Sequence, residues 1–147
     1  MGICCTLILH AQVSKTVNVL AGELASALTT EEKNTITNLT VKGTIDTRDF
    51  ETMRELLPIL EYIDLSEAKI VKKTIPICAF LFCSNLKTVK IPSNIKVIGN
   101  GAFQDCSNLV SISIPEKVTS IGRTAFMNCI NLSTINISKK IENIGED

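Results

Sequence analysis

The chain has 147 residues and no formal net charge, and 45% of its residues are hydrophobic while 20% are charged. This composition is typical of a globular domain that buries about two thirds of its unfolded surface, and it excludes a largely disordered chain. A neutral chain also lacks the basic surface that nucleic-acid binding needs, so we expect no nucleic-acid partner.

The first twelve residues, MGICCTLILHAQ, have the pattern of an incomplete secretory leader. Ile3 to Leu9 is a short apolar run, and Ala11 is the small residue that a signal peptidase prefers at its cut. A leader normally opens with Lys or Arg, and this segment has neither, so we interpret it as clipped and expect a secreted or cell-surface protein. No stretch approaches the roughly 18 apolar residues of a membrane-spanning helix, so we expect no transmembrane segment.

An acylated amino terminus is the alternative interpretation of the same segment. Met1-Gly2 with Thr6 matches the acylation pattern M-G-x-x-x-[ST], and Cys4 and Cys5 can carry palmitate. In that case the protein would be associated with a membrane through these lipids. Both interpretations leave residues 1–12 out of the fold.

Residues 13–59 contain three predicted elements. Leu20, Leu24 and Leu28 share one face of a helix, and residues 36–41, ITNLTV, alternate as a strand does. Asp46 can cap a second helix that stops near Pro58. The apolar side chains that this second helix is expected to bury are Phe50, Met53, Leu56 and Leu57.

Beyond residue 77 the sequence repeats at a constant step, giving the units 78–100, 101–123 and 124–146. The recurring positions are Ala-Phe at 79/80, 102/103 and 125/126, Cys at 83, 106 and 129, Asn-Leu at 85/86, 108/109 and 131/132, and Ile-Gly at 98/99, 121/122 and 144/145. A period of this length with Leu and Ile at fixed places predicts a solenoid, in which each coil stacks on the one before it.

Each unit is expected to form one coil with a defined cross-section. The pattern L-x-x-I/V-x-I predicts a strand, I-x-x-I-G crosses the second side, and AFxxCxNL is the returning arc with its Ala, Phe and Cys inside. Equivalent residues would stack about 4.8 Å apart, as in a parallel sheet. We therefore expect three ladders along the stack. Their members are Phe80, Phe103 and Phe126; Cys83, Cys106 and Cys129; and Asn85, Asn108 and Asn131, which are expected to satisfy backbone groups at the bend.

The pattern IPxxVTSIGxxAFxxCxNLxxIxIP closely resembles the BspA-like leucine-rich repeats of bacterial surface proteins. The resemblance implies an α/β solenoid, a right-handed coil with a parallel β-sheet, over residues 60–147. It implies an amino-terminal cap of helix, strand and helix over residues 13–59. Residues 60–70 resemble a first, irregular strand of that family, because the step from Leu60 to Leu86 is longer than the regular step from Leu86 to Leu109.

Several kinds of chemistry find no support in the residues. His10, in the predicted leader, is the single histidine, so Ser-His and Cys-His pairs and His-bearing zinc sites are excluded from the rest of the chain. Cys78 and Cys83 have a loose metal-like spacing, but Cys83 belongs to the ladder, so we interpret them as thiols and not as zinc ligands, with Cys78, off the ladder, partly accessible. Asp105, Glu116 and Glu142 occupy different coil positions and form no convergent pair. We expect no catalysis, no metal and no cofactor.

The outward positions of the predicted strands form the candidate binding face. Small polar groups repeated from coil to coil suit an extended partner held by many weak contacts. The eight candidate residues are Tyr62, Asp64, Thr88, Lys90, Ser111, Ser113, Thr134 and Asn136.

The resemblance implies a non-catalytic module for protein binding or adhesion, with a host matrix or cell-surface protein as the partner. The alternative is a structural spacer, or a fragment of a longer repeat protein with no ligand of its own. The chain ends in IENIGED at the Ile-Gly turn with no recognisable closing cap, so end-to-end self-association through the last coil is a further expectation.

Overall fold

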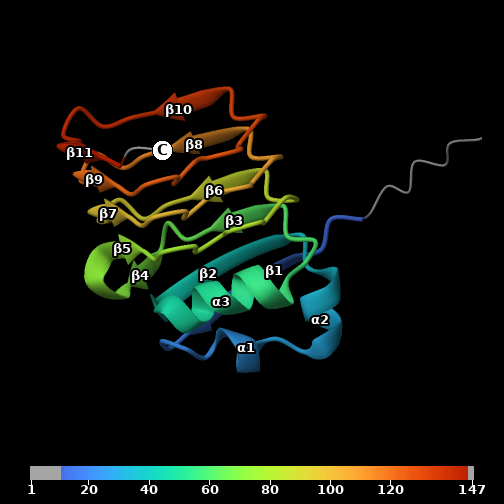
Figure 1. Cartoon of the computed structure of the whole chain (residues 1–147). Helices are drawn as coiled ribbons and strands as arrows, with labels where there is room; N and C mark the ends of the chain where they lie inside the picture. The colour runs from blue at the N-terminus through green and yellow to red at the C-terminus, as the bar shows by residue number, and fades with distance from the viewer. Residues whose placement is uncertain (1–10, 146–147) are drawn as a thin grey trace, which may run out of the picture.

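The computed structural model describes residues 11–145, so the predicted acylation sites Gly2, Cys4 and Cys5 lie outside the described residues. Residues 60–145 wind into coils that stack along one axis, and residues 11–59 cover one end of the stack (Figure 1). The predicted solenoid is confirmed.

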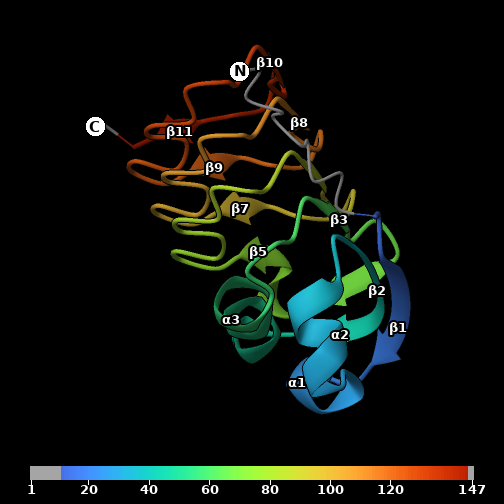
Figure 2. The same ribbon diagram turned by 90° about the vertical axis from the view of Figure 1, so that its right-hand side faces the viewer.

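Two parallel sheets run along the stack on different sides of the coils (Figure 2). The larger sheet has the order β1-β2-β3-β6-β8-β10, with β4 also paired to β2, and the smaller has the order β11-β9-β7-β5. The strands of the larger sheet are β1 (Ser14–Val19), β2 (Asn38–Ile45), β3 (Tyr62–Asp64), β4 (Ala68–Ile70), β6 (Thr88–Lys90), β8 (Ser111–Ser113) and β10 (Thr134–Asn136). Those of the smaller sheet are β5 (Thr74–Ile75), β7 (Val97–Ile98), β9 (Ser120–Ile121) and β11 (Asn143–Ile144).

The cap contains one more strand and shorter helices than the sequence predicts. Its helices are α1 (Leu24–Ala27), α2 (Thr30–Thr35) and α3 (Thr47–Leu56), and β1 precedes them. The predicted helical face of Leu20, Leu24 and Leu28 is wrong as a single helix. Leu20 lies exposed at a turn, Leu24 is buried in α1, and Leu28 has left the helix in an extended conformation. The predicted strand at 36–41 is found as β2, which begins at Asn38, and the helix capped by Asp46 is confirmed as α3. Phe50, Met53 and Leu57 are buried as expected, but the expectation for Leu56 is wrong, because its side chain is 42% exposed.

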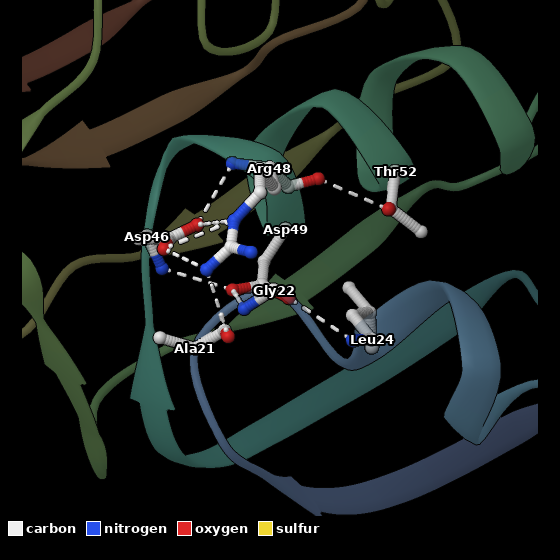
Figure 3. A network of polar contacts seen from close by, with 7 residues as sticks. All are labelled: Ala21, Gly22, Leu24, Asp46, Arg48, Asp49 and Thr52. Atoms are coloured by element: carbon white, nitrogen blue, oxygen red, sulfur yellow. Dashed lines mark hydrogen bonds and ion pairs between the residues drawn. The ribbon is translucent and has the colours of Figure 1, made fainter.

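A buried carboxylate explains why the chain turns at residue 22 instead of continuing as a helix (Figure 3). Asp49 of α3 accepts hydrogen bonds from the backbone N–H of Gly22 (2.7 Å), Leu24 (3.0 Å) and Asp46 (2.9 Å). Gly22 has φ +83°, a left-handed conformation that glycine adopts without steric cost. The carboxylate thus ties the first turn of α3 to the turn before α1, and satisfies donors at both places.

The phenylalanine ladder forms the centre of the stack. Phe80, Phe103 and Phe126 stack with ring centroids 5.4 and 5.3 Å apart, and Phe50 of α3 meets Phe80 edge to face at 5.6 Å. The cap therefore joins the same aromatic column as the coils. Such pairs contribute about 0.5–1.5 kcal/mol each beyond the area that they bury.

The cysteine ladder is bonded from coil to coil. The thiol of Cys106 donates to the carbonyl of Phe80 at 3.1 Å, and the thiol of Cys129 donates to the carbonyl of Phe103 at 3.0 Å. Cys106 is fully buried, whereas Cys83 and Cys129 are half-buried. Burial raises the pKa of all three thiols above the usual value, that of Cys83 to about 12, so they are protonated at neutral pH.

Two members of the asparagine ladder, Asn85 and Asn131, bond the backbone at the bend as expected, whereas Asn108 has no such bond within residues 11–145, and all three are exposed. The side-chain amide of Asn85 donates to the carbonyl of Pro58 at 2.9 Å, and that of Asn131 donates to the carbonyl of Ser107 at 2.7 Å.

The glycine of each Ile-Gly turn is required for a steric reason. A Cβ on Gly99 would lie 2.7 Å from the backbone nitrogen of Ile77, so adjacent coils approach too closely for a side chain.

Burial declines along the stack. Ile112 and Ile121 are 3% and 5% exposed, whereas their equivalents one coil later, Ile135 and Ile144, are 36% and 63% exposed. Inward residues of the unit 124–146 have partners on one side only among the described residues. Self-association through this coil stays a prediction.

Candidate binding surface

The structure places all eight predicted face residues on the outward side of the larger sheet, in register. Tyr62 pairs with Thr88, Thr88 with Ser111, and Ser111 with Thr134, which makes one row across four strands. Asp64 pairs with Lys90, and Ser113 with Asn136, in a second row two residues further along. Between the rows, Ile63, Val89 and Ile112 point inward and are buried. Whether these residues bind a partner stays a prediction.

Two strands of the cap lengthen this face, which the sequence reasoning missed. Ser14 of β1 pairs with Asn38 of β2, and Asn38 pairs with Tyr62, so the first row continues into the cap. Thr16 and Thr40 continue the second row up to Asp64 in the same way. The signal was present in SKTVNV, where polar residues alternate with Val17 and Val19.

A polar cluster occupies the middle of the face, where β3 meets β6. Asp64 accepts hydrogen bonds from the hydroxyls of Tyr62 (3.2 Å) and Ser66 (2.5 Å) and from the backbone N–H of Ser66 (2.9 Å). The ammonium of Lys90 lies 3.1 Å from the Asp64 carboxylate and 5.5 Å from the centre of the Tyr62 ring. The Lys90 ammonium, paired with Asp64, thus also lies within cation–π distance of the Tyr62 ring.

This cluster keeps Asp64 ionised and Lys90 protonated. Partial burial works against ionisation of Asp64, but the Ser66 hydrogen bonds and then Lys90 outweigh it and lower its pKa from 3.8 to about 2. The neighbouring hydroxyl of Tyr62 and the carboxylate of Asp64 raise the pKa of Lys90. The charges of the cluster therefore persist as a pair over the physiological pH range.

Elsewhere on the face one charge is paired and one is not: Lys69 of β4, opposite Thr44 of β2, is exposed and has no ion pair within residues 11–145. Lys42 of β2 lies 3.0 Å from the carboxylate of Glu67. The strands β8 and β10 present only hydroxyls and an amide, all exposed, from Ser111, Ser113, Thr134 and Asn136. The surface as a whole offers hydrogen-bond donors and acceptors in two straight rows without a strong field of either sign.

Other kinds of site were sought in the same part of the chain. Among residues 11–145 there is no group of three or more His, Cys, Asp or Glu side chains placed to hold a metal ion. Over the same range, no helix has both the length and the apolarity to cross a bilayer. The carboxylate of Asp105 accepts from the amide of Asn128 at 2.7 Å, and Glu116 lies beside Ser138, so these acids serve contacts between adjacent coils.

Comparison with known families identifies the type of repeat that forms these coils. The family model described as the BspA-type leucine-rich repeat region, in 6 copies, matches residues 59–147. The chain belongs to this family. The predicted membership is confirmed, and the matched copies include the irregular region from residue 59 as well as the regular units.

Two solved structures of leucine-rich repeat proteins share the fold. The first, from Bacteroides ovatus, is 24% identical with a TM-score of 0.59, over 89% of this chain and 33% of that one. The second, a leucine-rich cell-surface protein from Faecalibacterium prausnitzii, is 22% identical with a TM-score of 0.54, over 91% of this chain and 32% of that one. This chain therefore spans about one third of their length. No curated protein matches it.

Proposed function

We propose that the chain is a non-catalytic binding module of a secreted or surface-displayed leucine-rich repeat protein, and that it acts in adhesion. Its partner is a protein, of the kind found in a host matrix or on a cell surface. The observation that supports this most is the register of the first outward row, which runs strand by strand from Ser14 in the cap to Thr134 in the last coil.

The geometry suits an extended partner. Rows of donors and acceptors repeat at the strand spacing of about 4.8 Å, so a chain lying across the strands meets a new group at each coil. Small side chains let such a partner approach closely, and the Tyr62 ring supplies an aromatic contact of the kind enriched at interfaces. An enzyme would need a convergent reactive group, and the face supports none.

The test replaces one row while leaving the fold intact. Thr88, Ser111 and Thr134 lie on one line, so changing all three to Glu adds like charges in the path of any ligand at modest cost to stability. We expect the parent protein to be retained on one or more of a panel of immobilised matrix proteins or cells, and the triple variant to lose retention. Circular dichroism and urea unfolding check the fold.

A matched control has the same change in net charge. Changing Lys96, Lys117 and Lys140 to Gln alters exposed residues outside the strands of the larger sheet, and we expect it to leave retention unchanged. If neither parent nor variants are retained, the spacer interpretation replaces the binding module. If only the lysine changes abolish retention, the binding surface lies on the turns instead.

A further inference from the structure

Phe82 departs from the repeat in a way that packing does not explain. It lies on the arc of the first regular coil, not on the sheet face, and its side chain is 69% exposed. Its backbone has φ +61°, a left-handed conformation that is unfavourable for a bulky side chain. An aromatic residue that is both strained and exposed contributes little to the core.

The coil dictates this backbone conformation whatever residue occupies the position. The equivalent residues one and two coils later, Asp105 and Asn128, have φ +60° and +57°. The N–H of Phe82 donates to the carbonyl of Gln104 in the next coil, and the N–H of Asp105 donates to that of Met127 in the same way. Asp and Asn tolerate this conformation, so the repeat itself favours a small polar residue here.

The residues that precede Phe82 are also more apolar than the equivalent residues one repeat later. Ile77, 66% exposed, and Leu81, half-buried, precede it on the same arc. Their equivalents 23 residues later, Asn100 and Gln104, are polar. The first regular coil thus presents apolar groups where its neighbour, built on the same backbone, presents polar ones.

Two hollows flank the Phe82 ring. One, of about 330 Å³, is lined by Arg54, Glu55, Cys78, Leu81 and Phe82. The other, of about 220 Å³, lies between the end of α3 and the arc, and Arg54, Leu57, Phe80 and Phe82 are among its walls. The ring of Phe82 and the side chain of Arg54 are common to both.

Arg54 is held in a fixed orientation beside these hollows. Its Nε donates to the carboxylate of Glu55 at 2.7 Å, and its Nη1 donates to the carbonyl of Cys78 at 2.6 Å. Within residues 11–145 its Nη2 donates to no acceptor. The guanidinium is thus oriented by two of its nitrogens, one of them in an ion pair with Glu55, and the N–H groups of Nη2 can donate to an oxygen of an incoming carboxylate.

We propose that Phe82 and Arg54 form a second docking site, separate from the sheet face, for a protein segment that presents an apolar side chain next to a carboxylate. The apolar side chain packs against the Phe82 and Leu81 side chains, and the carboxylate meets the free Nη2 of Arg54. The cost in strain and exposure at Phe82 is then offset in the complex, because a buried aromatic anchor carries much of the energy of an interface.

The experiment selects peptides from a random-peptide phage library on the full chain. We expect enriched sequences in which an apolar residue lies within two positions of Asp or Glu. Binding of these peptides should fall about tenfold or more with Phe82→Asn and with Arg54→Gln. It should be unchanged in Asp105→Ala, at the same position one coil later, and in the Glu variant of the sheet face, which separates this site from the proposed function.

Folding of the Phe82→Asn variant supplies an independent measurement. Because Asn tolerates positive φ, we expect its midpoint of urea unfolding to be equal to that of the parent or higher. A clear fall in that midpoint would mean that Phe82 is a structural residue, and would overturn the proposal. It is equally overturned if no selected peptide depends on Phe82, or if the selected peptides lack an acidic residue.

Discussion

At the scale of single residues, the carboxylate of Asp64 is held ionised by contacts that the unfolded chain lacks. Its folded pKa of about 2 lies below the ordinary value of 3.8, so ionisation stabilises the fold above the ordinary value, and this stabilisation is lost as the pH falls toward 2. We expect Asp64→Asn to lower the free energy of unfolding by about 1 kcal/mol at neutral pH, since solvent at Lys90 screens the ion pair.

The difference between parent and Asp64→Asn should shrink by about half near pH 3. Urea unfolding of both proteins at the two pH values measures it. A difference that is the same at both values would mean that packing of the side chain, not its charge, is responsible.

The outward positions around Asp64 were predictable, whereas their contacts were not. Alternation along each strand identifies which side chains face out, and the longer step from Leu60 to Leu86 correctly pairs Tyr62 with Thr88 and Asp64 with Lys90. The regular step of the later coils would have set Lys90 opposite Glu67. The hydrogen bonds of Tyr62 and Ser66 to Asp64 depend on rotamers and on a turn, which periodicity does not specify.

At the scale of elements, the phenylalanine ladder links each coil to its neighbours. Phe103→Ala should lower the free energy of unfolding by about 3–5 kcal/mol, because rings on both sides hold the corner open and the cavity cannot collapse. Phe126 is half-buried and has one aromatic neighbour among the described residues, so Phe126→Ala should lower it by less. Urea unfolding compares the two variants, and equal losses would contradict the decline in burial along the stack.

In the cap, the local spacing of leucines predicts a longer helix than the one that forms. Leu20, Leu24 and Leu28 have helical spacing, yet the chain turns at Gly22 and the helix there is only four residues long. The turn is stabilised by Asp49, which lies 27 residues later in the sequence. A contact over that distance leaves no trace in the local pattern, so β1 and its share of the face could not be recovered from the leucines.

At the scale of the whole molecule, the thiols report how the stack opens. In a Cys4→Ser, Cys5→Ser background, Cys106 and Cys83 should react with a thiol reagent at mildly alkaline pH only on unfolding, since Cys106 is buried and burial raises the pKa of the half-buried Cys83 to about 12. Cys129, half-buried in the least buried coil, should react sooner, and Cys78 should be partly accessible. Mass spectrometry of timed labelling gives the order.

Reaction of Cys106 as fast as Cys129 under native conditions would show that the coils open together. A sequential order would show that the stack opens from the unit 124–146 inward, as expected when each coil contacts only its neighbours.

The stacking also determines how the molecule responds to tension. In the views of the fold, β1 and β11 lie at opposite ends of the stack, so a pull applied at these two strands runs parallel to the hydrogen bonds between coils (Figure 1). Bonds loaded in this direction give way one coil at a time instead of all at once. Each coil occupies about 4.8 Å of the axis. Pulled straight, a unit such as 101–123 extends to roughly 80 Å, so we expect the domain to lengthen in steps under load.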